Sequence, residues 1–267
     1  MTDQDRPTVT IALAGKGGTG KTTIAALLIR YLVRKRLGAV LAIDADPAAN
    51  LNLALGLPVA TTVGDIREEM LADVQTGAVG TGITRHDYLN TELRLAVEEG
   101  DQVDLLVMGR PEGQGCYCPV NHMLRDIIDR LGRQYAFVVI DNEAGMEHLS
   151  RRTTRDVDVL IVVTDPTVRG VTAAASIIKL ADELQINVGR TLLVVNRASG
   201  ELPPTLRAQL DQLPADLAAI IPNDPAVGAL DAEGQPLIML DAESPAMAAL
   251  EAFAGYLLAP AAEVAAN

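Results

Sequence analysis

One glycine-rich segment near the start of the chain constrains the fold more than any other feature. The β-branched run Thr8–Ala14 leads into it, a helical pattern over Thr22–Arg34 follows it, and it reads Gly15-Lys16-Gly17-Gly18-Thr19-Gly20-Lys21-Thr22-Thr23. This is the pattern G-x-x-x-x-G-K-[ST] between a strand and a helix, the context that the pattern requires. Glycines let backbone N–H groups converge on a phosphate, and the helix N-terminus adds the positive end of its dipole. The segment therefore predicts an α/β fold of the P-loop type that binds a nucleotide.

The residue types of the loop suggest individual roles. Lys21 is expected to reach the β- and γ-phosphates, and the Thr22 hydroxyl to coordinate Mg²⁺. Two of the four lysines of the chain, Lys16 and Lys21, lie in this loop, whereas arginines carry most of the positive charge. Solubility does not explain that concentration. The other residues expected to contact ATP or ADP here are Gly17, Gly18, Thr19, Gly20 and Thr23.

The rest of the chain repeats the same alternation of strand and helix. Hydrophobic residues make up 49% of it and aromatic residues 3%, which suits parallel strands of aliphatic residues covered on both faces. Strands are predicted at Thr8–Ala14, Ala39–Asp44, Val103–Met108, Phe137–Asp141, Val157–Thr164, Thr191–Asn196 and Leu217–Ile221. Helices are predicted at Thr22–Arg34, Asp87–Glu98, Val120–Leu131, Val171–Leu184, Leu206–Gln212 and Pro245–Leu258. We expect one domain over residues 1–267, with a mostly parallel sheet of about seven to eight strands flanked by helices.

The charge distribution excludes several classes of partner. The net charge is −13, and no Lys or Arg follows Arg207. Nucleic-acid binding needs clustered basic residues, and an amphipathic membrane anchor needs a basic face. The polar, acidic start of the chain has no secretory pattern, and no apolar run approaches the roughly 20 residues that span a bilayer. A cytoplasmic protein without a nucleic-acid or membrane partner is predicted.

Carboxylates follow two of the predicted strands. Asp44 and Asp46 end the second run, and Asp141 ends the run Phe137–Ile140. The carboxyl ends of parallel strands face the ligand crevice. Asp141 is therefore expected to hold Mg²⁺ through a water molecule, and Asp44 to lie close to the ion without binding it directly. Capping of a following helix is the alternative for Asp44 and Asp46. Gly145 lies just beyond Asp141 and can approach the γ-phosphate, although this stretch also fits a solvated helix start.

Two cysteines, Cys116 and Cys118, are separated by one residue in a glycine-rich loop. So close a spacing disfavours a disulfide. Two thiolates are half of a tetrahedral zinc site, which a two-fold dimer would complete, and thiolates also suit nickel. His122 is either an auxiliary ligand or an exposed helical side chain. Two reduced, buried thiols are the alternative for the pair.

The loop Gly15-Lys16-Gly17-Gly18 resembles the deviant Walker A loop of the partition, septum-positioning, arsenite-pump and tail-anchored-protein-targeting ATPases. The resemblance implies that the chain forms a homodimer on ATP binding and that Lys16 reaches the partner's nucleotide. Asp46-Pro47-Ala48 resembles the first switch of the arsenite and targeting ATPases, where the aspartate orients the attacking water. In the same subclass, an asparagine placed as Asn196 reads the adenine edge, and a loop placed as Ile221-Pro222-Asn223-Asp224 packs on the base.

A longer resemblance covers residues 8–250. The segments Gly115-Cys116-Tyr117-Cys118-Pro119 and Asp141–Thr153 look like those of the carbon monoxide dehydrogenase accessory ATPases, which act in nickel insertion. This implies a slow ATPase whose nucleotide-gated dimer holds Ni²⁺ or Zn²⁺ between Cys116 and Cys118 of both chains. Carbon monoxide dehydrogenase would be the client, with acetyl-CoA synthase as the alternative recipient. His148 could contact the metal. A spatial-organisation ATPase and an electron-donating iron protein are the competing functions.

Overall fold

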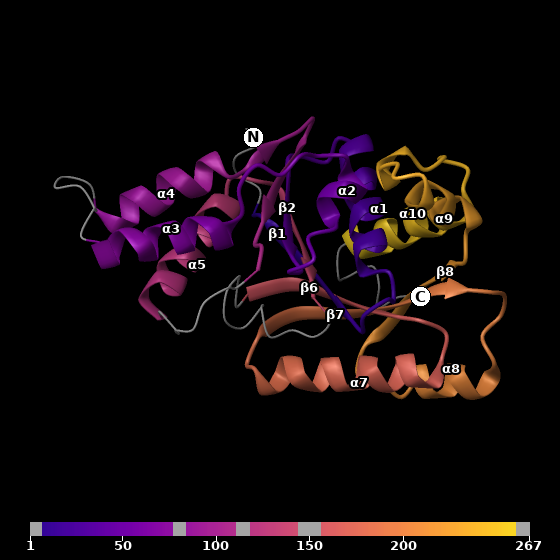
Figure 1. Ribbon diagram of the computed structural model, residues 1–267. Helices are drawn as coiled ribbons and strands as arrows, with labels where there is room; N and C mark the ends of the chain where they lie inside the picture. The colour runs from indigo at the N-terminus through magenta and orange to yellow at the C-terminus, as the bar shows by residue number, and fades with distance from the viewer. Residues whose placement is uncertain (1–6, 77–83, 111–117, 144–155, 260–267) are drawn as a thin grey trace.

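The computed structural model describes residues 7–76, 84–110, 118–143 and 156–259. These residues form one eight-stranded sheet in the order β3-β4-β2-β5-β1-β6-β7-β8 (Figure 1). Neighbouring strands are parallel, except that β3 runs antiparallel to β4. The strands are β1 (Val9–Gly15), β2 (Val40–Ala45), β3 (Glu98–Glu99), β4 (Val103–Val107), β5 (Phe137–Asn142), β6 (Asp156–Thr164), β7 (Asn187–Ala198) and β8 (Asp216–Pro222).

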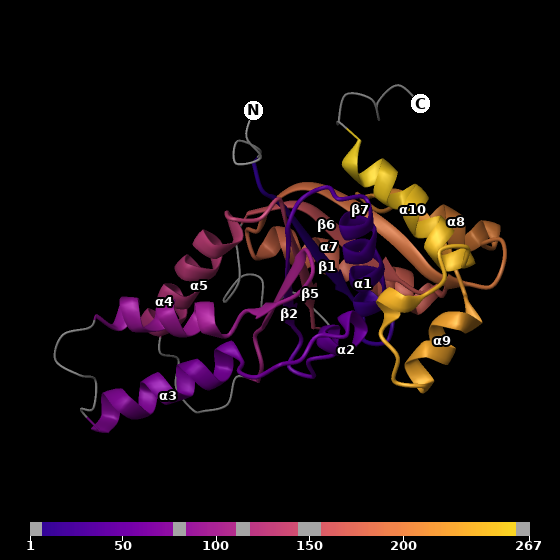
Figure 2. The same ribbon diagram turned by 90° about the horizontal axis from the view of Figure 1, so that it is seen from above.

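Helices cover both faces of the sheet. They are α1 (Lys21–Arg34), α2 (Leu51–Leu55), α3 (Val63–Thr76), α4 (Arg85–Leu95), α5 (Cys118–Gly132), α7 (Val168–Glu183), α8 (Pro204–Leu210), α9 (Pro225–Ala232) and α10 (Pro245–Leu258), with a 3-10 turn, η2 (Leu237–Met239). Helices α3, α4, α5, α7 and α8 cover one face, and α1, α2, α9 and α10 the other. Figure 2 shows α10 beside α1. The predicted α/β architecture is confirmed.

The central strand shows why the aliphatic runs form this sheet. Along β1, Ala12 and Ala14 enter the core under α5 and α7, whereas Ile11 and Leu13 enter the core under α1 and α10. Successive side chains of a strand point to opposite faces of the sheet. When helices cover both faces, the side chains on both faces must be apolar. The uninterrupted apolar runs therefore identified the seven long strands, each to within a few residues at its ends.

The edge strand β3 corrects one prediction. The helix expected over Asp87–Glu98 ends at Leu95, and Glu98 instead pairs antiparallel with Leu105. The Glu98 carboxylate also accepts a hydrogen bond from the backbone N–H of Ala60, at 2.7 Å. Two glutamates at a sheet edge carry no hydrophobic alternation, so the pattern gave no strand signal.

Three helices, α2, α3 and α9, were not predicted. Helix α3 does carry a helical spacing, because Val63, Ile66 and Met70 are all buried in the core. Helix α2 has only five residues, and none of α9 is buried, so neither offers a full apolar stripe. Across the described ranges, no helix combines the length and apolar character needed to cross a membrane. The expectation of one domain includes residues outside those ranges and stays a prediction.

Candidate nucleotide-binding site

The predicted phosphate loop lies at the carboxyl edge of the sheet, between β1 and α1. Gly18 and Gly20 have left-handed backbones, with φ of 81° and 88°, which strongly favour glycine. Gly20 is the N-cap of α1, where no side chain caps the helix and no acidic residue lies in its first turn. The first N–H groups of a 14-residue helix thus lack a side-chain acceptor, and they face the loop. This arrangement suits a phosphate.

The two lysines of the loop lie in different environments. Lys21 is buried, and its Nζ lies 3.4 Å from the Lys16 carbonyl oxygen, which also accepts a 2.9 Å hydrogen bond from Thr19 Oγ1. Lys16 itself is exposed. A long hydrogen bond to a neutral carbonyl is easily exchanged for one to a phosphate. The geometry is compatible with the phosphate role of Lys21 and leaves the Lys16 side chain accessible to another molecule.

Thr22 and Asp141 meet beneath the loop. Thr22 Oγ1 donates a 2.5 Å hydrogen bond to Asp141 Oδ2. Asp141 is 1% exposed, and among the described residues no donor reaches its Oδ1. Burial, together with the nearby carboxylate of Asp44, raises the pKa of Asp141 to about 7, although the hydrogen bond from Thr22 lowers it. A buried carboxylate oxygen beside a hydroxyl is a hard-oxygen pair that fits Mg²⁺, and the cation would balance the buried charge.

Asp44 contacts the first residue of α2, but the N-cap position, which was the alternative for Asp44, is occupied by Asn50. It lies opposite Asp141 in the register of β2 and β5 and is fully buried. Its Oδ1 accepts from the backbone N–H of Asp46 at 3.1 Å, and its Oδ2 accepts from that of Leu51, the first residue of α2, at 2.9 Å. Burial raises the pKa of Asp44 to about 6. The carboxylate thus holds the segment 46–51 in place. A position of Asp44 close to Mg²⁺, without direct binding, stays a prediction.

Asp46 begins that segment and is partly exposed. Its Oδ1 accepts a 2.8 Å hydrogen bond from the backbone N–H of Ala48, which closes a local turn. The other carboxylate oxygen is not needed for this turn. Orientation of an attacking water by Asp46 stays a prediction, and the described geometry leaves one oxygen for it.

A cavity of about 540 Å³ opens beside the loop, at the carboxyl ends of β7 and β8. Its walls include Thr22, Thr23, Asn196, Arg197, Pro222, Asn223 and Asp224. Asn196 is 4% exposed, and its Nδ2 donates to the Thr19 carbonyl oxygen at 2.9 Å. The amide group expected to read an adenine edge is therefore bonded to the phosphate loop as well. Base recognition by Asn196 and Pro222 stays a prediction, supported by their place in the cavity wall.

Sequence reasoning missed Arg197, and it placed Asp224 in the loop beside the base without predicting the contacts of its side chain. Arg197 Nη1 donates to the Gly18 carbonyl oxygen at 2.9 Å. Asp224 Oδ2 accepts from Ser244 Oγ at 2.5 Å and from the backbone N–H of Ala246 at 3.2 Å, which ties the loop after β8 to α10. The Asp224-Pro225 and Ser244-Pro245 pairs are helix-start signals that could have identified the second contact.

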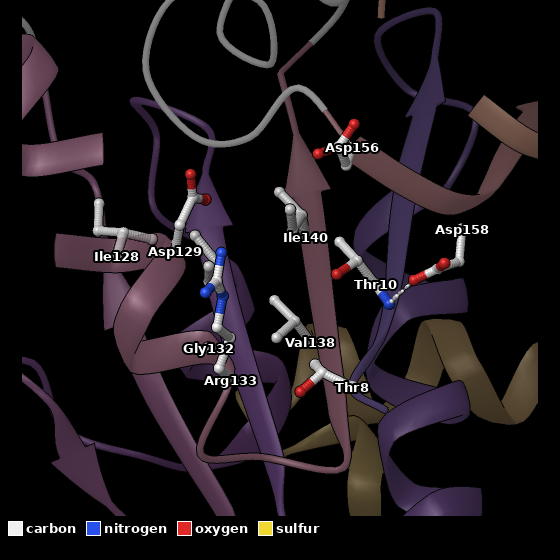
Figure 3. Close-up of a pocket in the computed structure, with 11 residues that line it drawn as sticks. Thr8, Thr10, Ile128, Asp129, Gly132, Arg133, Val138, Ile140, Asp156 and Asp158 are labelled. Carbon is white, nitrogen blue, oxygen red and sulfur yellow. Dashed lines mark hydrogen bonds between the residues drawn. The ribbon is translucent and has the colours of Figure 1, made fainter. Parts of the chain in front are cut away.

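A smaller cavity, of about 320 Å³, lies toward the amino ends of β1 and β6 (Figure 3). Thr8, Thr10, Asp156 and Asp158 line one side, and Asp129 and Arg133 of α5 line the other. The Thr10 backbone N–H already donates to Asp158 Oδ2 at 2.7 Å. This cavity contains none of the predicted nucleotide-site residues, so the larger cavity is the candidate site.

The predicted metal pair remains untested. Cys116, Gly145 and His148 lie outside the described residues, and for Cys118 and His122 only their place in α5 is described. Within the described ranges, no group of three or more His, Cys, Asp or Glu side chains could hold a metal ion.

Comparisons with known proteins agree with the fold and the loop. The model of the CobQ/CobB/MinD/ParA nucleotide binding domain family matches residues 10–237. An uncharacterized ATP-binding protein of Methanocaldococcus jannaschii is 46% identical over 227 residues, which cover 85% of this chain and 89% of that protein. The carbon monoxide dehydrogenase accessory protein CooC of Rhodospirillum rubrum is 36% identical over 237 residues, covering 84% and 87%.

Solved structures of the same fold are also similar. The septum site-determining protein MinD of Pyrococcus horikoshii, solved with Mg-ADP, superposes with a TM-score of 0.67 at 25% identity. The match covers 94% of this chain and 96% of that one. The predicted P-loop fold is thereby confirmed.

Proposed function

We propose, because the chain belongs to the CobQ/CobB/MinD/ParA family of nucleotide-binding ATPases, that it is a nucleotide-gated dimer that handles nickel for insertion into carbon monoxide dehydrogenase. The observation that carries the ATPase part is the hydrogen bond from Thr22 to the buried Asp141, beneath an uncapped helix N-terminus. The nickel part is supported by the 36% identity to CooC and by the two cysteines on either side of Tyr117 in the sequence.

In this mechanism the loop binds the phosphates of ATP. Lys21 exchanges the Lys16 carbonyl for the β- and γ-phosphates, and Thr22 and Asp141 would hold Mg²⁺. When bound, Mg²⁺ neutralises charge that develops on the phosphate oxygens. Asp46 orients the attacking water. Lys16 of the partner stabilises the transferring group, as an arginine finger does, so hydrolysis by the monomer is slow.

Site-directed variants test the hydrolysis step. Lys21→Ala is expected to lose ATP binding, whereas Asp46→Asn should bind Mg·ATP with little change yet hydrolyse it poorly. Asp211→Asn is a matched control, because this exposed aspartate pairs with Arg207 on α8. Titration calorimetry and phosphate release measure the two steps. Full turnover by Asp46→Asn would remove it from the mechanism.

Dimerisation depends on a difference in ATP affinity between monomer and dimer. Lys16 supplies that difference when it contacts the partner's nucleotide. Lys16→Ala should therefore keep ATP binding but weaken the shift from monomer to dimer in sedimentation velocity runs. Lys179→Ala is the control, since Lys179 is an exposed lysine of α7 that pairs with Glu183. An unchanged Lys16→Ala profile contradicts the role across the interface.

The cysteine pair links the dimer to nickel. One chain offers two thiolates, so the four-thiolate site forms only in the dimer, and metal and ATP each favour that state. Metal analysis of anaerobically purified protein should give one Ni²⁺ or Zn²⁺ per dimer. Wild type should activate nickel-free carbon monoxide dehydrogenase at limiting nickel, and Cys116→Ala/Cys118→Ala should not. Equal activation by wild type and the double variant would show that the cysteines are not needed for nickel insertion. Parallel assays with acetyl-CoA synthase identify the recipient of the nickel.

A spatial-organisation ATPase is the second candidate, favoured by the similarity to MinD. Such a protein binds DNA or a membrane surface. The net charge of −13 and the absence of Lys and Arg after Arg207 oppose this. Co-sedimentation with DNA or anionic liposomes in the presence of Mg·ATP decides between the two, and binding to either would favour the second candidate.

A further inference from the structure

Two consecutive side chains at the end of β7 bind two consecutive carbonyl groups of the phosphate loop. Asn196 Nδ2 donates to the Thr19 carbonyl oxygen and Arg197 Nη1 to the Gly18 carbonyl oxygen, each at 2.9 Å. The partners are 177 and 179 residues apart in sequence. Strand β6 separates β7 from β1 in the sheet, so these hydrogen bonds reach past one strand to the loop.

The backbone at Arg197 is specialised for this contact. Its φ is 60°, a left-handed conformation that is unfavourable for a residue with a Cβ atom. The register between β7 and β8 also shifts between Val195 and Ala198, so Arg197 lies in an irregular part of the ladder. Backbone strain of this kind persists where the surrounding structure requires it. Here the irregular backbone accompanies an arginine that bonds to the loop.

The loop needs such a contact at Gly18. This glycine has φ of 81°, and a Cβ placed on it would meet no described heavy atom within 4 Å. The tip of the loop therefore has little packing against the described part of the chain. Arg197 also lines the 540 Å³ cavity, so one side chain connects the proposed base cavity to the phosphate loop.

We propose that Arg197 is a positioning residue that holds the phosphate loop in its binding conformation through the Gly18 carbonyl. This inference rests on the proposed nucleotide function. It predicts that loss of the guanidinium weakens binding of phosphate-bearing ligands and leaves binding of the bare nucleoside unchanged. A guanidinium that contacted the base would affect both ligands alike.

The test uses Arg197→Gly, because glycine accepts the left-handed backbone and so removes the side chain without adding strain. The matched control is Arg36→Gly. Arg36 is also an exposed arginine with a left-handed backbone, at φ of 52°, but it lies after α1. Both variants should keep the thermal midpoint of wild type or exceed it. Arg197→Lys keeps the positive charge and one donor nitrogen, and it should recover part of the affinity.

Titration calorimetry with Mg·ADP and ligand-observed NMR with adenosine give the readouts. Arg197→Gly should raise the Kd for Mg·ADP by about 5- to 10-fold, as loss of one hydrogen bond implies, without change for adenosine. Arg36→Gly should match wild type for both ligands. An Arg197→Gly protein that binds Mg·ADP as Arg36→Gly does, or that loses equal affinity for both ligands, overturns the positioning role. If wild type itself fails to bind Mg·ADP, the proposed nucleotide function is wrong as well.

Discussion

Two glycines of the phosphate loop offer a matched pair of substitutions. Gly18 and Gly20 both have left-handed backbones, so alanine at either position is expected to lower the free energy of unfolding by about 1–2 kcal/mol. Only Gly20 is also crowded, since a Cβ there would collide with Asn196 Nδ2. Asn196 would have to move and release the buried Thr19 carbonyl, which costs about 1–3 kcal/mol more. Gly20→Ala should thus destabilise the protein by about 2–5 kcal/mol, and Gly18→Ala by only about 1–2 kcal/mol.

Urea unfolding followed by circular dichroism measures this difference, and the thermal midpoint should fall by about 2–4 °C for each kcal/mol. The double variant Gly20→Ala/Asn196→Ala supplies a check, because removing the Asn196 amide relieves the collision. The double variant should lose less free energy of unfolding than the two single variants lose together. Equal destabilisation by Gly18→Ala and Gly20→Ala, or strict additivity in the double variant, would refute the packing argument.

Three further outcomes are expected. The raised pKa values of Asp141 (about 7) and Asp44 (about 6) mean that the folded protein binds protons more tightly than the unfolded chain. The free energy of unfolding should therefore fall as pH rises from 4 to 7. Stabilisation by Mg·ADP should grow over the same pH range. Urea titration with and without Mg·ADP measures both effects. Asp44→Asn should keep Mg·ADP affinity in calorimetry but lower kcat. Its amide NH₂ cannot accept a hydrogen bond, so one of the two backbone N–H groups loses its acceptor and the segment that carries Asp46 loosens. Ser244→Ala should lower the free energy of unfolding by about 1–2 kcal/mol in urea, because it removes the N-cap of α10 and the contact with Asp224.

The sequence predicted the parts of the fold that depend on local pattern. A strand covered on both faces must be apolar throughout, so β1 and β5 appear directly as aliphatic runs. The loop after β1 is equally explicit, because its backbone needs glycine at φ values that other residues avoid. Helix α9 has no buried residue and β3 is a pair of glutamates, so neither has a hydrophobic pattern to detect.

The contacts of the site were harder to predict than its residues. Asp44 was recognised as a carboxylate at the ligand edge, but only the path of the chain after β2 shows that both of its oxygens bind backbone N–H groups. Arg197 gave no signal, since its bond to Gly18 depends on a shift in register near the end of β7. A pattern of residue types does not encode such a shift.

Charge explains why the site must be built so locally. The protein carries a net charge of −13, so a polyanion such as ATP is repelled at long range, and salt screens this repulsion beyond about 10 Å. In the proposed mechanism, the attraction comes from groups in direct contact: the two loop lysines, the uncapped N-terminus of α1, and a cation held by Thr22 and Asp141. The buried Asp141 carboxylate would oppose an uncomplexed phosphate, whereas a magnesium complex brings the positive charge that Asp141 lacks. The carboxylate that disfavours free ATP is therefore expected to select its magnesium complex.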